Sequence, residues 1–275
     1  MRLLARPAQY VALALYILFL GFPLLWLISA SVKSSGELNS LTVSLLPHEW
    51  HWENYTEALT RQGLLHSAWN SLLVALASTV LSIVISVPAA YVLARLKGKV
   101  RIAGVGWILV SQVFPVVLII LPLFLILRTL GLADSLVGLT LVHTTYMLPF
   151  ALWMLQGYVA AIPTELEEAG AMDGAGRFTV LRTIVFPLLA PGVVATAMFS
   201  FVSSWNEFFF ALVLLQSPEN YTLPITLNTF VGGEGRTALG PLAAGAVLAA
   251  IPSIVFFSIL RRKLTSGLMA GAVKG

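Results

Sequence analysis

The sequence predicts an all-α integral membrane protein that crosses the bilayer six times. Hydrophobic residues make up 58% of the 275 residues and charged residues only 10%, with a mean hydropathy of +0.91. A soluble domain does not have this composition. Six uncharged runs each exceed the roughly 20 residues that a helix needs to cross a hydrocarbon core of about 30 Å. We predict spans at about 10–32, 67–94, 102–127, 136–160, 188–214 and 240–260.

The first hydrophobic run is expected to remain as a span rather than to be removed as a signal peptide. Arg2 and Arg6 give it a basic start, but its apolar stretch is far longer than the core of about 7–15 residues that a signal peptide has. The six spans are then expected to form a single transmembrane domain over residues 1–275.

Lys and Arg predict which span ends face the cytoplasm, because positive residues flanking spans are retained on the inner side. With the N-terminus inside, twelve of the sixteen Lys and Arg residues fall in inner segments, and four fall outside: Lys33, Arg61, Arg128 and Arg236. Both termini of this multi-pass protein of the cell membrane are therefore expected in the cytoplasm. The formal charge of +4 reflects topology, so membrane lipid is the expected partner and nucleic acid is not.

Thiol and metal chemistry find no support in the sequence. The chain has no cysteine, which excludes disulfides, thiolate metal sites and thiol nucleophiles. His48, Glu49 and His51 have the spacing H-E-x-H, which does not place two imidazoles on one helical face as H-E-x-x-H does. The Trp and Tyr residues around them are typical of anchors at a membrane interface. We expect no metal site.

One strongly polar stretch, ELEEAGAMDGAGR at 165–177, lies between two hydrophobic runs. Thr164 and Glu167 have the spacing of a capping box, which predicts a short helix that begins here. The acidic residues of its first turn lie near the positive end of the helix dipole. This helix is expected to expose small residues that let another surface approach its backbone: Ala169, Gly170 and Ala171.

A turn and a second helix are expected to follow. Asp173-Gly174 is a turn signal, and Asp173 is expected to cap a helix that Pro187 ends. Phe178, Leu181 and Val185 would line one side of that helix. The alternative is a plain polar connector, but a connector rarely needs two patterned helices and a tight turn. We therefore predict a cytoplasmic helix-turn-helix, at about 163–187, that docks another protein.

Residues 168–175, EAGAMDGA, followed by Ile184 and Pro187, resemble the EAA loop of permease subunits of binding-protein-dependent ABC importers, EAA-x-x-DGA…I-x-LP. The sequence departs from this pattern at Gly170, where the family usually has Ala, and at Phe186, where it usually has Leu. Gly170 is expected to loosen the helix by up to about 1 kcal/mol. Three further stretches resemble the maltose-type carbohydrate permeases: Asn70-Ser71 with AAYVLAR at 89–95, SSWNEFFFAL at 203–212, and GLMAGAVKG at 267–275.

The resemblance implies a permease that moves a carbohydrate or sugar-like solute into the cytoplasm by alternating access. It implies three kinds of protein partner: a second homologous permease subunit, two cytoplasmic ATPase subunits and an external solute-binding protein. The sequence has no G-x-x-x-x-G-K-[ST] phosphate loop, so ATP and Mg²⁺ are expected on the ATPases, with no cofactor and no enzymatic activity on this chain. The residues implied to couple to the ATPases are Glu168, Ala169, Gly170, Asp173, Gly174 and Ala175 in the loop, and Gly271, Ala272, Lys274 and Gly275 in the tail.

Candidate solute contacts lie in the fourth and fifth spans. Thr196, Ser200, Ser203, Ser204 and Glu207 follow one another at helical spacings, so we expect them to share one face of the fifth span. An acid inside a span indicates function, unless it reaches water at the outer interface. A hydroxyl-rich solute needs hydrogen-bonding groups and aromatic faces. The residues that could supply them are Trp205, Asn206, Glu207, His143, Thr144 and Tyr146, with ordinary interhelical hydrogen bonding as the alternative role and the partner permease as the alternative holder of the solute.

Two other classes of protein were weighed. An ion-coupled secondary transporter usually has internal repeats and ionisable groups at the midplane, whereas this sequence shows no repeat and offers only Glu207 and His143. A membrane-embedded enzyme needs a convergent catalytic site, and no nucleophile and base pair stands out. A requirement for ATP distinguishes the importer from both.

Overall fold

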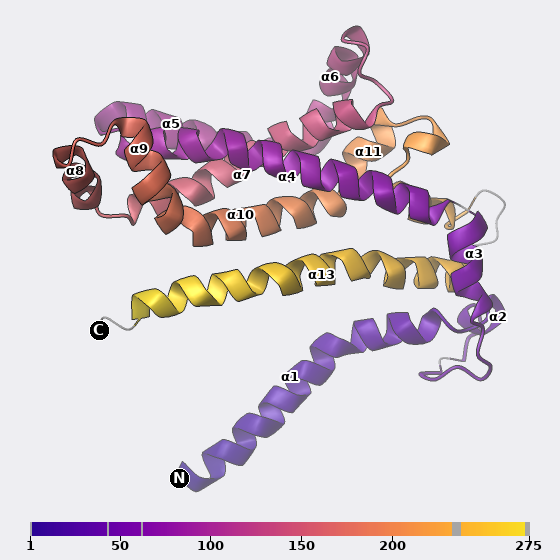
Figure 1. Cartoon of the computed structure of the whole chain (residues 1–275). Coiled ribbons are helices and arrows are strands. Elements are labelled where there is room, and N and C mark those ends of the chain that lie inside the picture. The colour runs from indigo at the N-terminus through magenta and orange to yellow at the C-terminus, as the bar shows by residue number, and fades with distance from the viewer. Residues whose placement is uncertain (1, 43, 62, 233–237, 273–275) are drawn as a thin grey trace. The chain divides into compact units, whose positions relative to one another are not determined.

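The computed structural model describes residues 2–42, 44–61, 63–232 and 238–272, and in these ranges it is helical with no strand. This confirms the all-α prediction. Figure 1 shows the chain, and backbone contacts divide it into two compact units. Unit 1 is Met1–Ala68 with Leu223–Ile251, and unit 2 is Trp69–Thr222 with Pro252–Gly275.

Unit 1 contains the first span and the segments that follow it. Its helices are α1 (Arg2–Ala30), α2 (Ser35–Leu38), α3 (Glu53–Arg61), α12 (Leu223–Thr229), the first turn of α4 (Leu64–Arg95) and the first part of α13 (Leu239–Ala272). The buried Asn54 amide donates to the carbonyls of Ser31 and Lys33, at 3.0 and 2.9 Å. These bonds tie α3 to the end of α1, where the backbone would otherwise lack partners.

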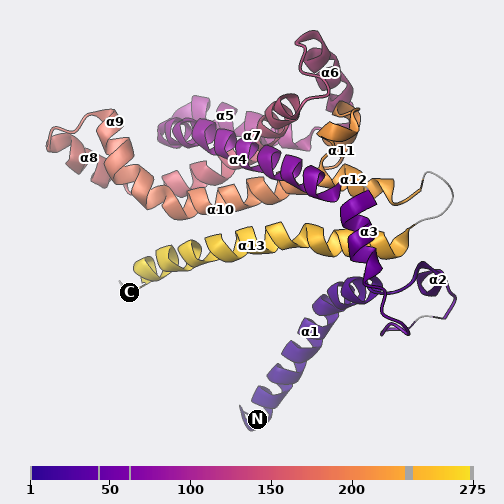
Figure 2. The same cartoon turned by 45° about the vertical axis from the view of Figure 1, so that its right-hand side comes forward.

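Unit 2 contains most of the other spans. Its helices are α4 beyond its first turn, α5 (Gly98–Val113), α6 (Val116–Thr129), α7 (Leu136–Ala160), α8 (Thr164–Met172), α9 (Arg177–Val180), α10 (Phe186–Trp205), α11 (Phe209–Leu214) and the end of α13. Figures 1 and 2 both place α8 and α9 at one end of the bundle of α4, α7 and α10, and α6 and α11 at the other. Small residues let these helices approach closely: the Ser78 hydroxyl donates to Ser204 across α4 and α10, at 3.1 Å.

Five helices of the described chain are long and apolar enough to span a membrane, at Gln9–Ala30, Leu64–Arg95, Leu136–Ala160, Arg177–Trp205 and Leu239–Leu260. The helices α5 and α6, with a bend of 94° between them, make a sixth span when the pair is counted as one. The span predicted over 102–127 thus corresponds to two helices with a sharp bend between them. Phe114 is extended, with ψ of 124°, because the ring of Pro115 disfavours helical backbone before it and removes a donor.

The fifth span also differs from its prediction of 188–214. The helix ends at Trp205, Asn206 forms its C-cap, and a new helix, α11, begins at Phe209. At its other end, α10 continues without interruption from α9 through a π-helical turn at Leu181–Val185. The span is thus shifted toward α8 and broken near Glu207.

Candidate functional site

The short helix α8 ends in a turn in which Asp173, Gly174 and Ala175 each have a structural role. The backbone N–H of Ala175 donates to the carbonyl of Gly170 and that of Gly174 to the carbonyl of Ala171, each at 3.0 Å. This pair of bonds is the Schellman motif, which satisfies the last carbonyls of a helix. The motif requires a left-handed residue, and Gly174 has φ of +84°. The predicted Asp-Gly turn is confirmed, with Asp173 as the C-cap of α8.

The predicted capping box at the start of α8 is wrong. Pro163 is the N-cap residue, with no side-chain cap, and Thr164 lies one position inside the helix. Glu167 turns away from the helix start and instead accepts hydrogen bonds from Arg95 and Tyr91 of α4. The Arg95 guanidinium and the Tyr91 hydroxyl together occupy both oxygens of the carboxylate, whereas a capping box would offer it one backbone N–H.

The predicted second helix exists, but neither of its ends was predicted correctly. Gly176 caps α9, without a side-chain bond, and Asp173 belongs to the turn before it. Pro187 does not end the helix, because the π-helical turn before it accommodates the missing N–H. Phe178 is exposed, whereas Val185 is fully buried and Leu181 partly buried, so the three do not share one environment.

A buried apolar cluster fixes α9 and the turn after α8 to the ends of three spans. It joins α4, α7 and the α9–α10 helix, and Ala175 of the turn packs against it. Its fully buried members include Ala90, Leu155, Val159, Val185 and Leu189. Because such a cluster loses stability with any unfilled volume, the loop is held as part of the bundle and not as a free connector.

The residues that resemble the EAA signature divide into an inner and an outer set. Glu168, Ala169, Ala171 and Asp173 are exposed. Gly170 faces inward: a Cβ added there would lie 2.6 Å from Cδ1 of Ile184. The predicted exposure of Ala169 and Ala171 is confirmed, while Gly170 contributes close packing. In the tail, Gly271 and Ala272 lie in α13 but their side chains, and all of Lys274 and Gly275, are outside the described residues.

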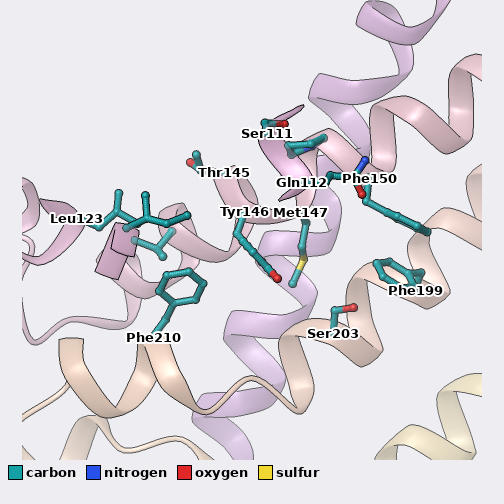
Figure 3. Close-up of a pocket in the computed structure, with 13 residues that line it drawn as sticks. Ser111, Gln112, Leu123, Thr145, Tyr146, Met147, Phe150, Phe199, Ser203 and Phe210 are labelled. Atoms are coloured by element: carbon teal, nitrogen blue, oxygen red, sulfur yellow. The ribbon is translucent and has the colours of Figure 1, made fainter. Parts of the chain in front are cut away.

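A pocket of about 410 Å³ lies between α5, α6, α7, α10 and α11 in unit 2 (Figure 3). Its wall combines aromatic rings with short polar side chains. The aromatic residues are Tyr146, Phe150, Phe199 and Phe210, and the polar ones are Ser111, Gln112, Thr145 and Ser203. Phe150 and Phe199 stack with ring centroids 3.8 Å apart, and Tyr146 meets Phe210 edge to face at 5.3 Å.

Both broken spans contribute to this pocket. Ser111 and Gln112 come from the end of α5, just before the 94° bend, and Phe210 follows the break after α10. Backbone that leaves the helix at membrane depth is tolerated where protein covers it or where it lines a cavity, and interrupted helices often surround transport sites. The bend and the break are therefore structural reasons for the cavity.

Only one of the six predicted solute contacts lines the pocket, and it is Tyr146. Trp205 is buried and stacks on Phe201, and Asn206 is exposed with its amide on the carbonyl of Val202. Thr144 is buried with its hydroxyl on the carbonyl of Thr140. Sequence reasoning missed Ser111, Gln112, Phe150 and Phe199, although Pro115 signalled the break beside them.

His143 and Glu207 form a polar pair, with His143 buried and Glu207 partly buried. The His143 ring is 1% exposed, with Nδ1 at 2.7 Å from the Ser204 hydroxyl and Nε2 at 3.2 Å from Glu207. The Glu207 carboxylate also accepts the N–H groups of Phe210 and Ala211, at 2.9 and 3.2 Å, and so caps α11. Glu207 therefore lies beyond the end of α10 and not on its helical face. The His143 ring, which contacts both Ser204 and Glu207, connects it to that face.

Asp134 joins the α6–α7 turn to the segment after α11, and we call this contact the clasp. Its carboxylate accepts hydrogen bonds from the Ser217 hydroxyl and from the backbone N–H groups of Gln216 and Ser217. The hydroxyl bond contributes most to lowering the pKa of Asp134 to about 2. The backbone there is left-handed, with φ of 52°, a conformation that Asp adopts more readily than most residues.

Comparison with known proteins identifies the family. The family model of the binding-protein-dependent transport system inner membrane component matches residues 82–268. A putative ABC transporter permease protein of Streptomyces antibioticus is 55% identical, over 80% of this chain and 96% of that protein. A diacetylchitobiose uptake system permease protein of Streptomyces coelicolor is 36% identical, over 94% of each chain.

The fold agrees with a solved importer. A chain in the crystal structure of a bacterial ABC transporter involved in the import of the acidic polysaccharide alginate superposes with a TM-score of 0.78 and 24% identity, covering 94% of this chain and 96% of that one. The chain belongs to the family of binding-protein-dependent transport system inner membrane components, the multi-pass permease subunits of ABC importers.

Proposed function

We propose that this permease moves a carbohydrate or sugar-like solute into the cytoplasm by alternating access, within one permease domain. ATP, with Mg²⁺, is bound by two partner ATPases, and an external binding protein delivers the solute to this subunit and a second, homologous permease. The 36% identity to the diacetylchitobiose uptake permease supports the solute class. The resemblance of the stretches at 89–95 and 203–212 to carbohydrate permeases supports it as well.

We propose that α8 and both chain termini face the cytoplasm. Lys and Arg gather in the segments beside α8, between α4 and α5 and after α9, as the positive-inside rule requires. In this orientation α6 and α11, at the opposite end of the bundle in Figures 1 and 2, face the external binding protein.

One observation carries the coupling role of α8: a surface of small exposed residues stands on a rigidly held turn. Ala169 and Ala171 are exposed while the turn after them is closed by two hydrogen bonds and packed on the buried cluster. A partner can drive a conformational change only if it binds the two states of the permease with different affinity. The contacted element must also be rigid, because a flexible element would move without moving the spans. We propose that Glu168, Ala169 and Asp173 contact the ATPase, that Gly170, Gly174 and Ala175 shape the turn, and that the tail at 271–275 reaches the ATPase dimer interface.

The test replaces Ala169 with Arg. The new side chain points away from the buried cluster, so the permease is expected to insert and fold, but it fills the approach to the backbone of α8. We expect loss of ATPase subunits on affinity purification and loss of ATP-driven uptake. Glu165→Arg, at an exposed position of the first turn of the same helix, is the control and is expected to retain both. Normal ATPase recovery and uptake by Ala169→Arg would refute docking at α8.

We further propose that the pocket beside Tyr146 is part of the solute path. Four aromatic rings and four short polar side chains supply the stacking faces and hydrogen bonds that a sugar uses, and this replaces the six-residue path expected from the sequence. Ser203→Leu is expected to lower uptake while the binding protein still binds solute. The substitution Val202→Leu, at the exposed neighbouring position of α10, is the matched control. Equal uptake by both variants would place the path elsewhere.

A further inference from the structure

The stretch AAYVLAR at 89–95, which the coupling loop and the solute pocket leave unexplained, ends in a polar joint between α4 and α8. Arg95, the last residue of α4, donates from Nε to Oε1 of Glu167 at 2.9 Å, and its Nη2 also contacts that oxygen. The Tyr91 hydroxyl donates to Oε2 of the same carboxylate at 2.7 Å. The Arg95 Nη2 also donates to the carbonyl of Ile162, after the end of α7, at 3.1 Å. We call these three side chains, Tyr91, Arg95 and Glu167, the clamp.

The clamp is shielded from solvent, which distinguishes it from ordinary surface ion pairs. The side chains of Arg95 and Glu167 are 20% and 14% exposed, and both oxygens of the carboxylate are occupied. Exposed pairs contribute little because water and salt screen them. A shielded Arg and carboxylate with several hydrogen bonds has a fixed geometry. The clamp therefore fixes the position and orientation of α4 relative to α8, in addition to holding the two helices in contact.

Chain connectivity gives this joint its importance. The helix α8 is joined covalently to α7 through residues 161–163 and to α10 through α9. The helix α4 has no such link to α8. Its contacts with α8 and with the adjoining ends of α7 and α10 include the clamp and the apolar cluster, where Ala90 and Ala94 contribute. Apolar contacts are not directional, so they permit α4 to slide, whereas the clamp does not.

We propose that the clamp is the joint through which movement of α8 reaches α4, so that Tyr91, Arg95 and Glu167 are positioning residues for transport. This inference rests on the proposed docking of ATPase at α8. When ATP binding moves α8, α7 and α10 follow through the backbone, and α4 follows through Glu167. Without the clamp, the ATPases still dock and hydrolyse ATP, but α4 no longer moves in register and the solute path does not open fully.

The activity test uses the assembled complex in proteoliposomes with its binding protein. Glu167→Gln keeps the shape of the side chain and removes its charge. We expect ATPase subunits to remain bound and ATP hydrolysis to stay within about twofold of the parent, while solute taken up per ATP falls about 5- to 100-fold, the range of a typical coupling free energy. Glu165→Gln, at an exposed position of the same helix, is the control. Tyr91→Phe, which removes one hydrogen bond, is expected to reduce the ratio less than Glu167→Gln does.

A distance measurement separates transmission from simple destabilisation. Met172 of α8 and Val92 of α4 are 89% and 57% exposed, so both accept a spin label. The distance between the labels is expected to be equal in the nucleotide-free and ATP-bound complexes of the parent, and to differ between those states in Glu167→Gln. The reversed pair, Arg95→Glu with Glu167→Arg, is expected to recover part of the uptake ratio that each single variant loses.

Three results would overturn the clamp. An unchanged ratio of uptake to hydrolysis in Glu167→Gln would show that α4 follows α8 without it. A label distance that changes with nucleotide in the parent would show that α4 and α8 do not move together. Loss of the ATPases from Glu167→Gln, but not from Glu165→Gln, would assign Glu167 to docking. Failure of docking itself appears separately, in the Ala169→Arg variant.

Discussion

The turn at α8 and the pocket beside Tyr146 belong to the same unit of the molecule but are built in opposite ways. At α8, a Schellman turn, a buried apolar cluster and the clamp leave little room for independent movement. At the pocket, two spans are broken and about 410 Å³ remains open. On the proposed function, the difference teaches where such a permease needs rigidity and where it needs adaptability: the partner ATPase would act on a stiff element, and the solute would pass where helices are interrupted.

Removing side-chain volume is the strongest way to test this contrast. Leu189 is fully buried in the cluster at α8, so Leu189→Ala is expected to destabilise the permease by about 2–5 kcal/mol through the cavity that it leaves. Phe199, which lines the open pocket, is 43% exposed, so Phe199→Ala is expected to cost about 1 kcal/mol, mainly its stacking on Phe150. Thermal unfolding in detergent compares the two. Equal losses would mean that the two regions do not differ in packing.

The turn itself offers a matched pair of glycines. Gly174 has φ of +84°, so Gly174→Ala is expected to destabilise the turn by about 1 kcal/mol through backbone strain. Gly176, two residues later, has φ of −67° and open space around its Cα, and Gly176→Ala is expected to be neutral. The measurement is thermal stability together with recovery of the ATPases. Sensitivity at Gly176 equal to that at Gly174 would contradict the Schellman turn as the rigid element.

Gly170 gives a smaller and more specific test. An Ala there gains up to about 1 kcal/mol of helix propensity, but its Cβ meets Cδ1 of Ile184 at 2.6 Å. We therefore expect Gly170→Ala alone to change stability little and Gly170→Ala with Ile184→Val, which removes that methyl group, to be more stable than Ile184→Val alone. The comparison is made by double-mutant thermal unfolding. A full gain of about 1 kcal/mol in the free energy of unfolding of Gly170→Ala alone would mean that the Ile184 side chain moves aside without an energetic cost.

The clasp at Asp134 is expected to give an effect that depends on pH. Because its pKa lies at about 2 in the folded protein, below its ordinary value of 3.8, its contribution is present above about pH 4 and is lost as pH falls toward 2. Asp134→Asn should therefore be less stable than the parent at neutral pH, and the difference should shrink between pH 4 and 2. Parallel unfolding curves over that range would show that the carboxylate charge does not stabilise the clasp.

The amphipathic and compositional signals predicted the fold well, and the breaks in helices less well. Uncharged length alone located spans such as Leu136–Ala160, because the bilayer fixes how long a span must be. The bend at Phe114 was signalled by Pro115, but a proline in a span is also compatible with a mild kink, so its 94° angle depends on tertiary packing.

Side-chain partners that are distant in sequence could not be predicted. The spacing of Thr164 and Glu167 favoured a local cap, whereas Glu167 pairs with Arg95, 72 residues earlier. Likewise, the helical spacing of Glu207 placed it on the face of α10, whereas the helix ends before it and the side chain caps α11. Local spacing ranks local partners. It could not show that Glu167 pairs with a distant Arg, or that the break after Trp205 makes Glu207 the cap of a new helix.

The most direct test of the account is uptake by the complete complex in proteoliposomes, driven by ATP or by an ion gradient. The parent is expected to take up a labelled oligosaccharide only with ATP and the loaded binding protein, and the Ala169→Arg variant is expected to show no such uptake. Uptake driven by a proton or sodium gradient without ATP, or undiminished ATP-driven uptake in Ala169→Arg, would contradict the claim that α8 couples this permease to an ATPase.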